Sequence, residues 1–114
     1  MSLNHKQMMF ASDVGKLLTY ATRTGQPVIL AEAFRTAYQA KEYARTGKGI
    51  KNSAHCKKLA VDLFRYEDGT IIWRRNAYYD LGKYWKGLRV GNVWGGDWKR
   101  RDCVHFSRLH KGVK

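Results

Sequence analysis

The chain has 114 residues, and its 22 Lys and Arg residues against nine Asp and Glu residues give a formal net charge of +13. A chain of this length buries one hydrophobic core, so we expect a single domain over residues 1–114, and 44% hydrophobic residues exclude a wholly disordered protein. Two cysteines, with no Cys-x-x-Cys pair, exclude a disulfide framework and a cysteine-rich zinc module.

The first half of the chain contains two helical patterns separated by a short apolar run. Apolar residues recur at three- and four-residue steps over residues 10–21, which predicts a helix that ends by Gly25. The apolar run at 28–31 predicts a buried strand. Thr36 and the glutamine three residues after it form a capping-box pattern, so we expect a second helix over 37–45.

The second half begins with a polar, basic loop, which we place at 48–58. Residues 59–66 then alternate between two sets of side chains, which is the pattern of a strand. The dipeptide Asp68-Gly69 is a hairpin signal, so residues 70–73 are expected to form the return strand.

The remaining residues predict a third helix and a final strand. Apolar residues at helical steps over 78–88 predict a helix, the glycine-containing stretch at 94–98 predicts a loop, and residues 104–109 predict a strand. Helices come first and strands gather later. We therefore predict an α+β fold, with helices packed on a small antiparallel sheet.

Four residues with metal-binding or acid–base side chains lie near the starts of predicted strands. His55 and Asp62 flank the start of one strand. Asp102 and His105 flank the start of another, and two antiparallel strands can bring these ends together. Two His and one Asp would give Zn²⁺ three ligands and leave a position for water, and Asp102 would then be the general base. Taken singly, each residue also fits an ordinary hydrogen-bonded histidine or a turn-capping aspartate.

Five short segments resemble sequence blocks of the M15 family, which contains D-alanyl-D-alanine carboxypeptidases and endolysin peptidases. The segments are Phe-Arg-Thr-Ala-Tyr-Gln at 34–39, Ser-Ala-His at 53–55, Ala-Val-Asp at 60–62, Trp-Gly-Gly-Asp-Trp at 94–98 and Asp-Cys-Val-His-Phe at 102–106. They follow the family's order and span most of the chain. The similarity is closest to the single-domain peptidases encoded by phages and prophages.

This resemblance assigns roles to five residues. His55, Asp62 and His105 correspond to the family's zinc ligands, and Asp102 corresponds to its catalytic carboxylate. Arg35 corresponds to the arginine that faces the developing oxyanion. The resemblance also implies a Hedgehog/D-Ala-D-Ala peptidase-like fold with the zinc site at the sheet.

Further side chains near these residues are candidates for contacts with the substrate. Ser53 and Gln39 are candidate hydrogen-bond partners of the substrate or of the arginine, and each fits a capping role equally well. Trp94 and Trp98 flank two glycines beside the predicted site, so we expect them to form a wall of the substrate pocket.

Five other residues near the predicted site have open roles. Lys58 stands where the family usually has a glycine, so either the turn there has a different shape or Lys58 lies in an accessible backbone region. Val104 replaces a frequent proline and Ser107 a common glutamate, and neither change removes a ligand. Cys56 and Cys103 are expected to be small buried hydrophobic residues, with zinc ligation or a disulfide as the alternatives.

The resemblance implies a zinc peptidase that cuts the peptide stems of bacterial peptidoglycan, either at L-Ala–D-Glu or at D-Ala–D-Ala. A basic single-domain chain favours the lytic endopeptidase, a phage or prophage endolysin. A basic nucleic-acid-binding module is an alternative from another class, but it leaves the His and Asp residues unexplained. A degenerate zinc protein that only binds would need neither Asp102 nor Arg35.

The net charge of +13 implies an anionic partner, which we expect to be the bacterial envelope and not nucleic acid. We expect a monomer without a separate cell-wall-binding domain. Residues 1–10 lack the apolar stretch of a signal peptide, and no apolar run approaches about 20 residues. We therefore expect synthesis in the host cytoplasm without a signal peptide and action on the cell wall, in the periplasm, after release.

Overall fold

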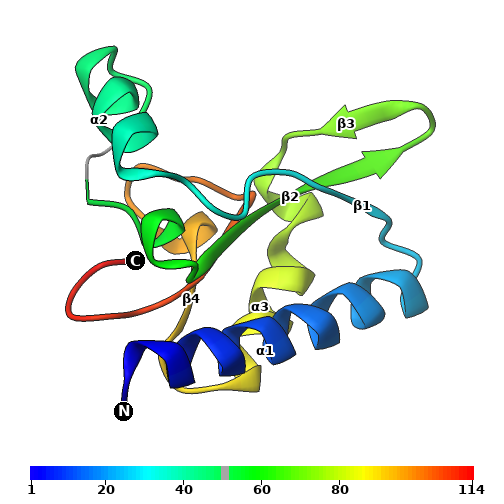
Figure 1. Ribbon diagram of the computed structural model, residues 1–114. Helices are drawn as coiled ribbons and strands as arrows, with labels where there is room; N and C mark the ends of the chain where they lie inside the picture. The colour runs from blue at the N-terminus through cyan, green and yellow to red at the C-terminus, as the bar shows by residue number, and fades with distance from the viewer. Residues whose placement is uncertain (50–51) are drawn as a thin grey trace.

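A five-stranded antiparallel sheet runs through the part of the chain that the computed structural model describes, residues 1–49 and 52–114 (Figure 1). Arg65 pairs with both Val28 and Ile72, so the strand that contains Arg65 has neighbours on both of its edges. The spatial order is β1-β2-β5-β4, with β3 paired to β2 outside this path. The strands are β1 (Val28–Leu30), β2 (Ala60–Glu67), β3 (Thr70–Ile72), β4 (Asn92–Trp94) and β5 (His105–Arg108).

Three helices accompany the sheet in the described part of the chain: α1 (Leu3–Arg23), α2 (Ala37–Arg45) and α3 (Tyr79–Leu88). α1 and α3 pack against each other, whereas α2 stands apart on the far side of the sheet from α1 (Figure 1). α1 begins earlier than predicted, because Ser2 Oγ accepts a hydrogen bond of 3.1 Å from the His5 N–H and so caps the first turn. Of the helices described, none has the length and apolar composition needed to cross a membrane.

The hydrophobic core lies between the sheet and the helices α1 and α3. Leu17 from α1, Trp85 from α3, Leu63 from β2 and Trp94 from β4 are completely buried there. Successive side chains of a strand point to opposite faces, so Leu63 faces this core and the preceding Asp62 faces away from it. The alternation of β2 therefore places Asp62 on the face of the sheet that α1 and α3 leave uncovered.

The predicted α+β class with an antiparallel sheet is confirmed, and two local signals were accurate. Thr36 Oγ1 accepts a hydrogen bond of 3.1 Å from the Gln39 N–H and caps α2. Asp68 and Gly69 join β2 to β3 with φ angles of 51° and 78°, the left-handed pair that a type I′ hairpin requires.

Three expectations about local structure need correction. The strand at 28–31 was expected to be buried, but it is an edge strand in which Ile29 is 40% and Leu30 59% exposed. The stretch at 94–98 is not a plain loop, because its first residue ends β4 and the 3-10 helix Gly95–Asp97 follows. The loop predicted at 48–58 contains the 3-10 helix Ala54–Lys57, and its residues 50 and 51 lie outside the described residues.

Two glycines enclose the indole ring of Trp94. A Cβ atom on Gly82 of α3 would lie 2.2 Å from Trp94 Cδ2, and a Cβ atom on Gly96 would lie 2.1 Å from Trp94 Cζ2. Trp94 Nε1 donates a hydrogen bond of 2.8 Å to the Cys103 carbonyl, which ties the ring to the segment before β5. The ring is therefore held in place, and no side chain larger than hydrogen fits at either glycine without a shift of the ring.

We predict that Gly82→Ala destabilises the fold by about 3 kcal/mol, because the added methyl group overlaps the fixed Trp94 ring. Gly87→Ala in the same helix is the matched control, since nothing lies within 4 Å of its Cβ position. That change should stabilise the protein by up to about 1 kcal/mol through helix propensity. Urea denaturation of the two variants measures the difference, and equal stabilities would contradict the packing described for Trp94.

Candidate metal centre

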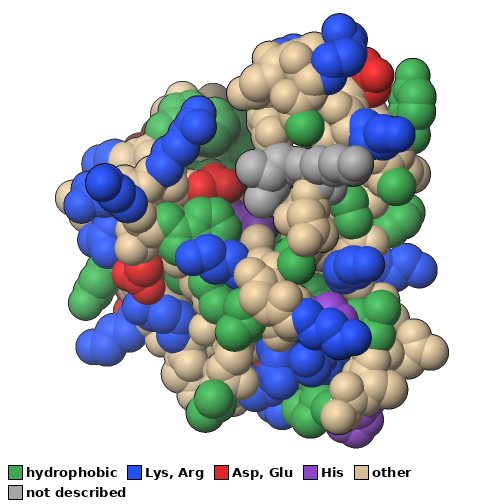
Figure 2. Space-filling view, turned by 90° about the vertical axis from the view of Figure 1, so that its left-hand side faces the viewer, with side chains coloured by type: hydrophobic (Ala, Val, Ile, Leu, Met, Phe, Trp, Pro, Cys, Tyr) green, Lys and Arg blue, Asp and Glu red, His purple; other side chains and the backbone are tan. Residues whose placement is uncertain are grey.

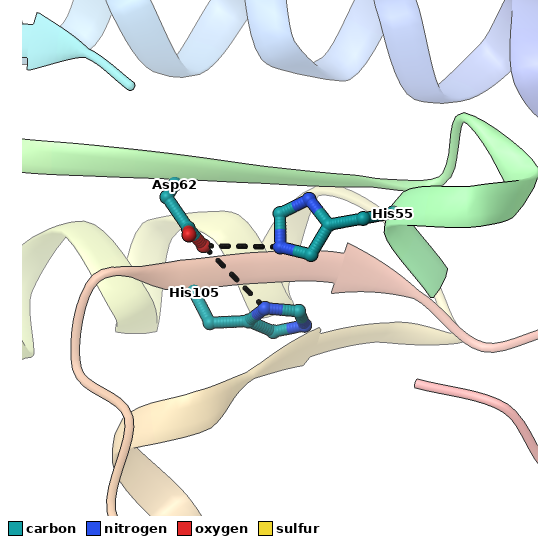
Figure 3. Close-up of side chains that lie close together, drawn as sticks. All are labelled: His55, Asp62 and His105. Carbon is teal, nitrogen blue, oxygen red and sulfur yellow. Dashed lines mark ion pairs between the residues drawn. The ribbon is translucent and has the colours of Figure 1, made fainter. Parts of the chain in front are cut away.

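Two imidazoles and one carboxylate meet on the face of the sheet that α1 and α3 leave uncovered (Figure 3). His55 comes from the 3-10 helix that precedes β2, Asp62 from β2 and His105 from the start of β5. Asp62 Oδ1 lies 3.3 Å from His55 Nε2 and 3.5 Å from His105 Nδ1. The structure thus brings together the three side chains that the sequence predicts to be metal ligands.

The backbone fixes this arrangement in two ways. Asp62 and His105 are directly paired residues of β2 and β5, so their side chains point to the same face. Ser53 Oγ accepts a hydrogen bond of 3.2 Å from the His55 N–H and caps the 3-10 helix. Lys58 then turns the chain into β2 with φ 56° and ψ 37°, the left-handed region that glycine adopts freely. The lysine therefore lies in an accessible backbone region.

The spacing of the three donor atoms suits a tetrahedral metal ion. Zinc bonds to nitrogen and oxygen of about 2.0–2.1 Å place neighbouring ligand atoms about 3.4 Å apart in a tetrahedron. The two distances from Asp62 Oδ1 bracket that value, and all three donor atoms lie within 4.8 Å of one another. Two imidazole nitrogens and one carboxylate oxygen leave a fourth position open, as catalytic zinc sites do.

The orientation of the His55 ring is set by its second nitrogen. His55 Nδ1 donates to the Ala33 carbonyl over 3.1 Å, which directs Nε2 towards Asp62. Burial acts to lower the pKa of His55, but the contact with Asp62, the Ala33 carbonyl and the charge of Glu32 raise the pKa overall. Metal binding needs the neutral ring, so it would have to displace any proton from Nε2.

Asp62 Oδ1 is the atom that both imidazoles approach. Burial acts to raise the pKa of Asp62, but the neighbouring imidazoles of His105 and His55 hold the pKa below its usual value. Within the described residues, its buried Oδ1 has no hydrogen-bond partner of good geometry. A cation between the three side chains would satisfy this oxygen, so the residues present fit a divalent metal.

A cavity of about 510 Å³ opens over these three side chains. Arg35, Ser53 and Asp102 line it, as does Trp98, whose ring lies 4.9 Å from that of His105. Figure 2 shows a hollow on this side of the molecule, with histidine and acidic side chains in view and Lys and Arg side chains spread around it. The candidate ligands, the candidate base and the arginine therefore face one space.

Asp102 stands at the edge of this cavity, next to the metal ligands. Its N–H donates to the Gly95 carbonyl over 2.9 Å, and its own carbonyl accepts from the His105 N–H over 3.1 Å. The residue is exposed as a whole, but partial burial of its carboxylate raises its pKa, as does the charge of Asp62, against the opposing charge of His105. A raised pKa suits a group that accepts and returns a proton near neutral pH.

Glu32 is a site residue that the sequence analysis missed. Its Oε1 contacts Arg35 at both Nε and Nη2, and it lies 3.5 Å from His55 Nδ1. Glu32 therefore contacts one side of the Arg35 guanidinium and leaves Nη1 without a contact to this carboxylate. The ring of Tyr43 lies 4.8 Å from Arg35 Cζ. An acidic residue in the apolar stretch before Arg35 was the available signal.

Two of the predicted substrate contacts need correction. Trp94 is completely buried and is not among the residues that line the cavity, so it is part of the core and Trp98 alone of the pair faces the substrate space. Gln39 is also not among the lining residues, and its backbone N–H is the group that Thr36 caps. Ser53 both lines the cavity and caps the 3-10 helix of His55.

Gly95 allows a close approach of two backbone segments beside the site. A Cβ atom on Gly95 would lie 2.2 Å from the Asp102 carbonyl oxygen and 3.0 Å from His105 Cβ, so only glycine allows this approach.

Cys56 and Cys103 are free cysteines, each half-buried. Neither belongs to the group of three that holds candidate metal ligands in the described part of the chain.

Comparison with known proteins agrees with the resemblance to the M15 family. Residues 46–108 match the sequence profile of an M15 peptidase family described as D-alanyl-D-alanine carboxypeptidase. The chain is 29% identical over 110 residues to the peptidoglycan L-alanyl-D-glutamate endopeptidase CwlK of Bacillus subtilis (strain 168), with 78% of this chain and 65% of CwlK covered. The chain therefore spans a little under two thirds of the length of this relative.

Two solved structures share the fold. The L-Ala D-Glu endopeptidase ChiX of Serratia marcescens superposes with a TM-score of 0.73 at 23% identity, covering 88% of this chain and 77% of ChiX. The vancomycin resistance D,D-pentapeptidase VanY, solved in complex with Zn(II), gives a TM-score of 0.60 at 18% identity, covering 90% of this chain and 71% of VanY. Because the profile match alone spans more than half of its residues, the chain belongs to the M15 family of peptidases.

Proposed function

We propose that this protein is a zinc-dependent peptidase that hydrolyses the L-Ala–D-Glu bond in the peptide stems of peptidoglycan. The observation that carries the proposal is the convergence of His55 and His105 on one oxygen of Asp62, at the floor of an open cavity. The choice of bond is supported by CwlK and ChiX, both of which are named as endopeptidases for L-Ala and D-Glu.

The residues of the site have three different roles in amide hydrolysis. His55, Asp62 and His105 would hold Zn²⁺, which acts as a Lewis acid and lowers the pKa of a bound water towards about 7. Asp102 takes the proton from the attacking water and returns it to the leaving nitrogen. Arg35 lines the cavity and is oriented by its ion pair with Glu32. It faces the negative charge that develops on the carbonyl oxygen, a contribution of about 3 kcal/mol.

A D-Ala–D-Ala carboxypeptidase is the second candidate, because the family profile carries that description and VanY is named as a D,D-pentapeptidase.

A nucleic-acid-binding module would use the positive charge but not the buried His–Asp–His group. A degenerate zinc protein that only binds would have no use for Asp102 and Arg35, and both line the cavity beside the ligands.

We predict one zinc ion per chain after purification without chelators. His55→Ala and His105→Ala should each lose most of the zinc, because each removes one of three protein ligands. Cys56→Ala and Cys103→Ala are the controls and should keep it, since neither thiol belongs to the ligand group. Metal analysis by mass spectrometry measures the content, and full retention in both histidine variants would show that the ion binds elsewhere.

Digestion of purified peptidoglycan followed by mass spectrometry tests the reaction. Cleavage at L-Ala–D-Glu releases stem peptides with a new amino-terminal D-Glu, whereas the second candidate releases free D-Ala. Asp102→Asn should keep its zinc and lose activity by on the order of 10²-fold or more, because the proton acceptor is gone. If intact zinc-loaded protein releases neither product, or if Asp102→Asn is fully active, the proposed mechanism is wrong.

We also propose that the protein is a phage or prophage endolysin, made in the bacterial cytoplasm, that reaches the cell wall after release and adheres to the anionic envelope through its basic surface. The net charge of +13 and the Lys and Arg side chains in Figure 2 support adhesion. Lysis of permeabilised cells should then weaken above roughly 0.15 M salt, where the Debye length is about 8 Å, more than cleavage of a small stem peptide does. Equal salt dependence of both would count against surface adhesion.

A further inference from the structure

The walls of the cavity carry far more positive than negative charge. In the described part of the chain, five cationic side chains line the cavity: Arg35, Lys48, Arg100, Arg101 and Lys114. The two carboxylates that line it, Asp62 and Asp102, are both assigned to metal binding and proton transfer. A bound Zn²⁺ would add two further positive charges to the same space.

Among the described cations that line the cavity, Arg35 alone has an acidic partner, and Lys114 Nζ lies 5.1 Å from the centre of the Trp98 ring. Within residues 1–49 and 52–114, no carboxylate lies within ion-pair distance of Lys48, Arg100 or Arg101. The arginine of the oxyanion position, by contrast, is paired with Glu32, and outside the cavity Asp97 is shared by Arg75 and Lys86. Exposed cations in a hollow raise the local concentration of anionic groups, and here they lie beside a candidate metal site.

The two candidate bonds have one chemical feature in common. In L-Ala–D-Glu linked onward through the γ-carboxyl group, and in D-Ala–D-Ala at a chain end, the carbon that bears the scissile nitrogen also bears a free carboxylate. That carboxylate is two bonds from the scissile nitrogen. When the scissile carbonyl sits at the metal centre, the carboxylate must therefore lie within the same cavity.

We propose that Lys48, Arg100 and Arg101 bind this carboxylate and make the enzyme selective for substrates in which it is free and not amidated. The proposal rests on the proposed function. Guanidinium groups bind a carboxylate through charge-assisted, often bidentate hydrogen bonds. A carboxamide in the same place carries no charge and turns NH₂ donors towards cationic donors. These three residues, which we call the cationic wall, therefore determine specificity and are separate from the residues that carry out the hydrolysis.

The test uses two pairs of peptides and two double variants. One pair is a stem peptide with L-Ala–D-Glu and its α-carboxamide form, and the other is a stem ending in D-Ala–D-Ala and its carboxamide form. Arg100→Gln with Arg101→Gln removes two charges from the cavity wall. Arg74→Gln with Lys83→Gln removes the same charge from exposed positions that are not among the lining residues.

The wild-type protein and the Arg74/Lys83 variant should cleave the free acid with a kcat/KM on the order of 10-fold or more above that of the amide. The Arg100/Arg101 variant should lose this preference and keep its zinc. The pair that is cleaved identifies the source of the carboxylate. A wild-type protein that treats acid and amide alike, or a preference that survives in the Arg100/Arg101 variant, would overturn the inference.

Binding separates this inference from the proposed function. The same peptides are titrated into zinc-loaded Asp102→Asn protein, with and without the Arg100 and Arg101 changes, and followed by tryptophan fluorescence. Preferential binding of the acid that disappears with the two arginines supports the cationic wall even if no peptide is cleaved, in which case the proposed activity alone fails. Equal binding of acid and amide overturns the inference whether or not cleavage occurs.

Discussion

The structure depends on one oxygen atom, Asp62 Oδ1, which two imidazoles approach at 3.3 and 3.5 Å. His55 Nδ1 donates its proton to a backbone carbonyl, so in the neutral ring Nε2 carries no proton. The lone pair of Nε2 then faces the Asp62 oxygen. A buried lone pair beside a carboxylate is unfavourable unless a cation lies between them, whether a proton or a metal. The pairing of β2 with β5 and the cap on the 3-10 helix before β2 both serve to hold these three groups together.

The Trp-Gly-Gly-Asp-Trp stretch supports the site through backbone packing. Trp94 fills the core, and Gly96 lies against its ring. Gly95 admits the carbonyl of Asp102, which places the candidate base beside the metal ligands. Trp98 packs against the ring of His105 and faces the cavity. A sequence block that looks like a binding loop is thus mainly the scaffold on which the base and one ligand are positioned.

Local patterns predicted what depends on neighbouring residues, and tertiary packing decided the rest. The hairpin at Asp68-Gly69 was predicted because the turn type depends on these two neighbouring residues. The His–Asp–His group was predicted because the segments that contain these residues resemble blocks of the M15 family, in the family's order. An apolar run does not show whether its strand lies at an edge, so the exposure of β1 was missed. Glu32 and the burial of Trp94 were missed because both depend on contacts with distant segments, Glu32 with His55 and Trp94 with Gly82 of α3.

The measurement that tests the central claim most directly is anomalous diffraction at the zinc edge from crystals of the active, zinc-loaded protein. The account predicts one peak at bonding distance, about 2.0–2.2 Å, from His55 Nε2, Asp62 Oδ1 and His105 Nδ1, with the fourth position facing the cavity. A peak bound instead by Cys56 or Cys103, or a fully active crystal with no peak between the two histidines, would contradict it.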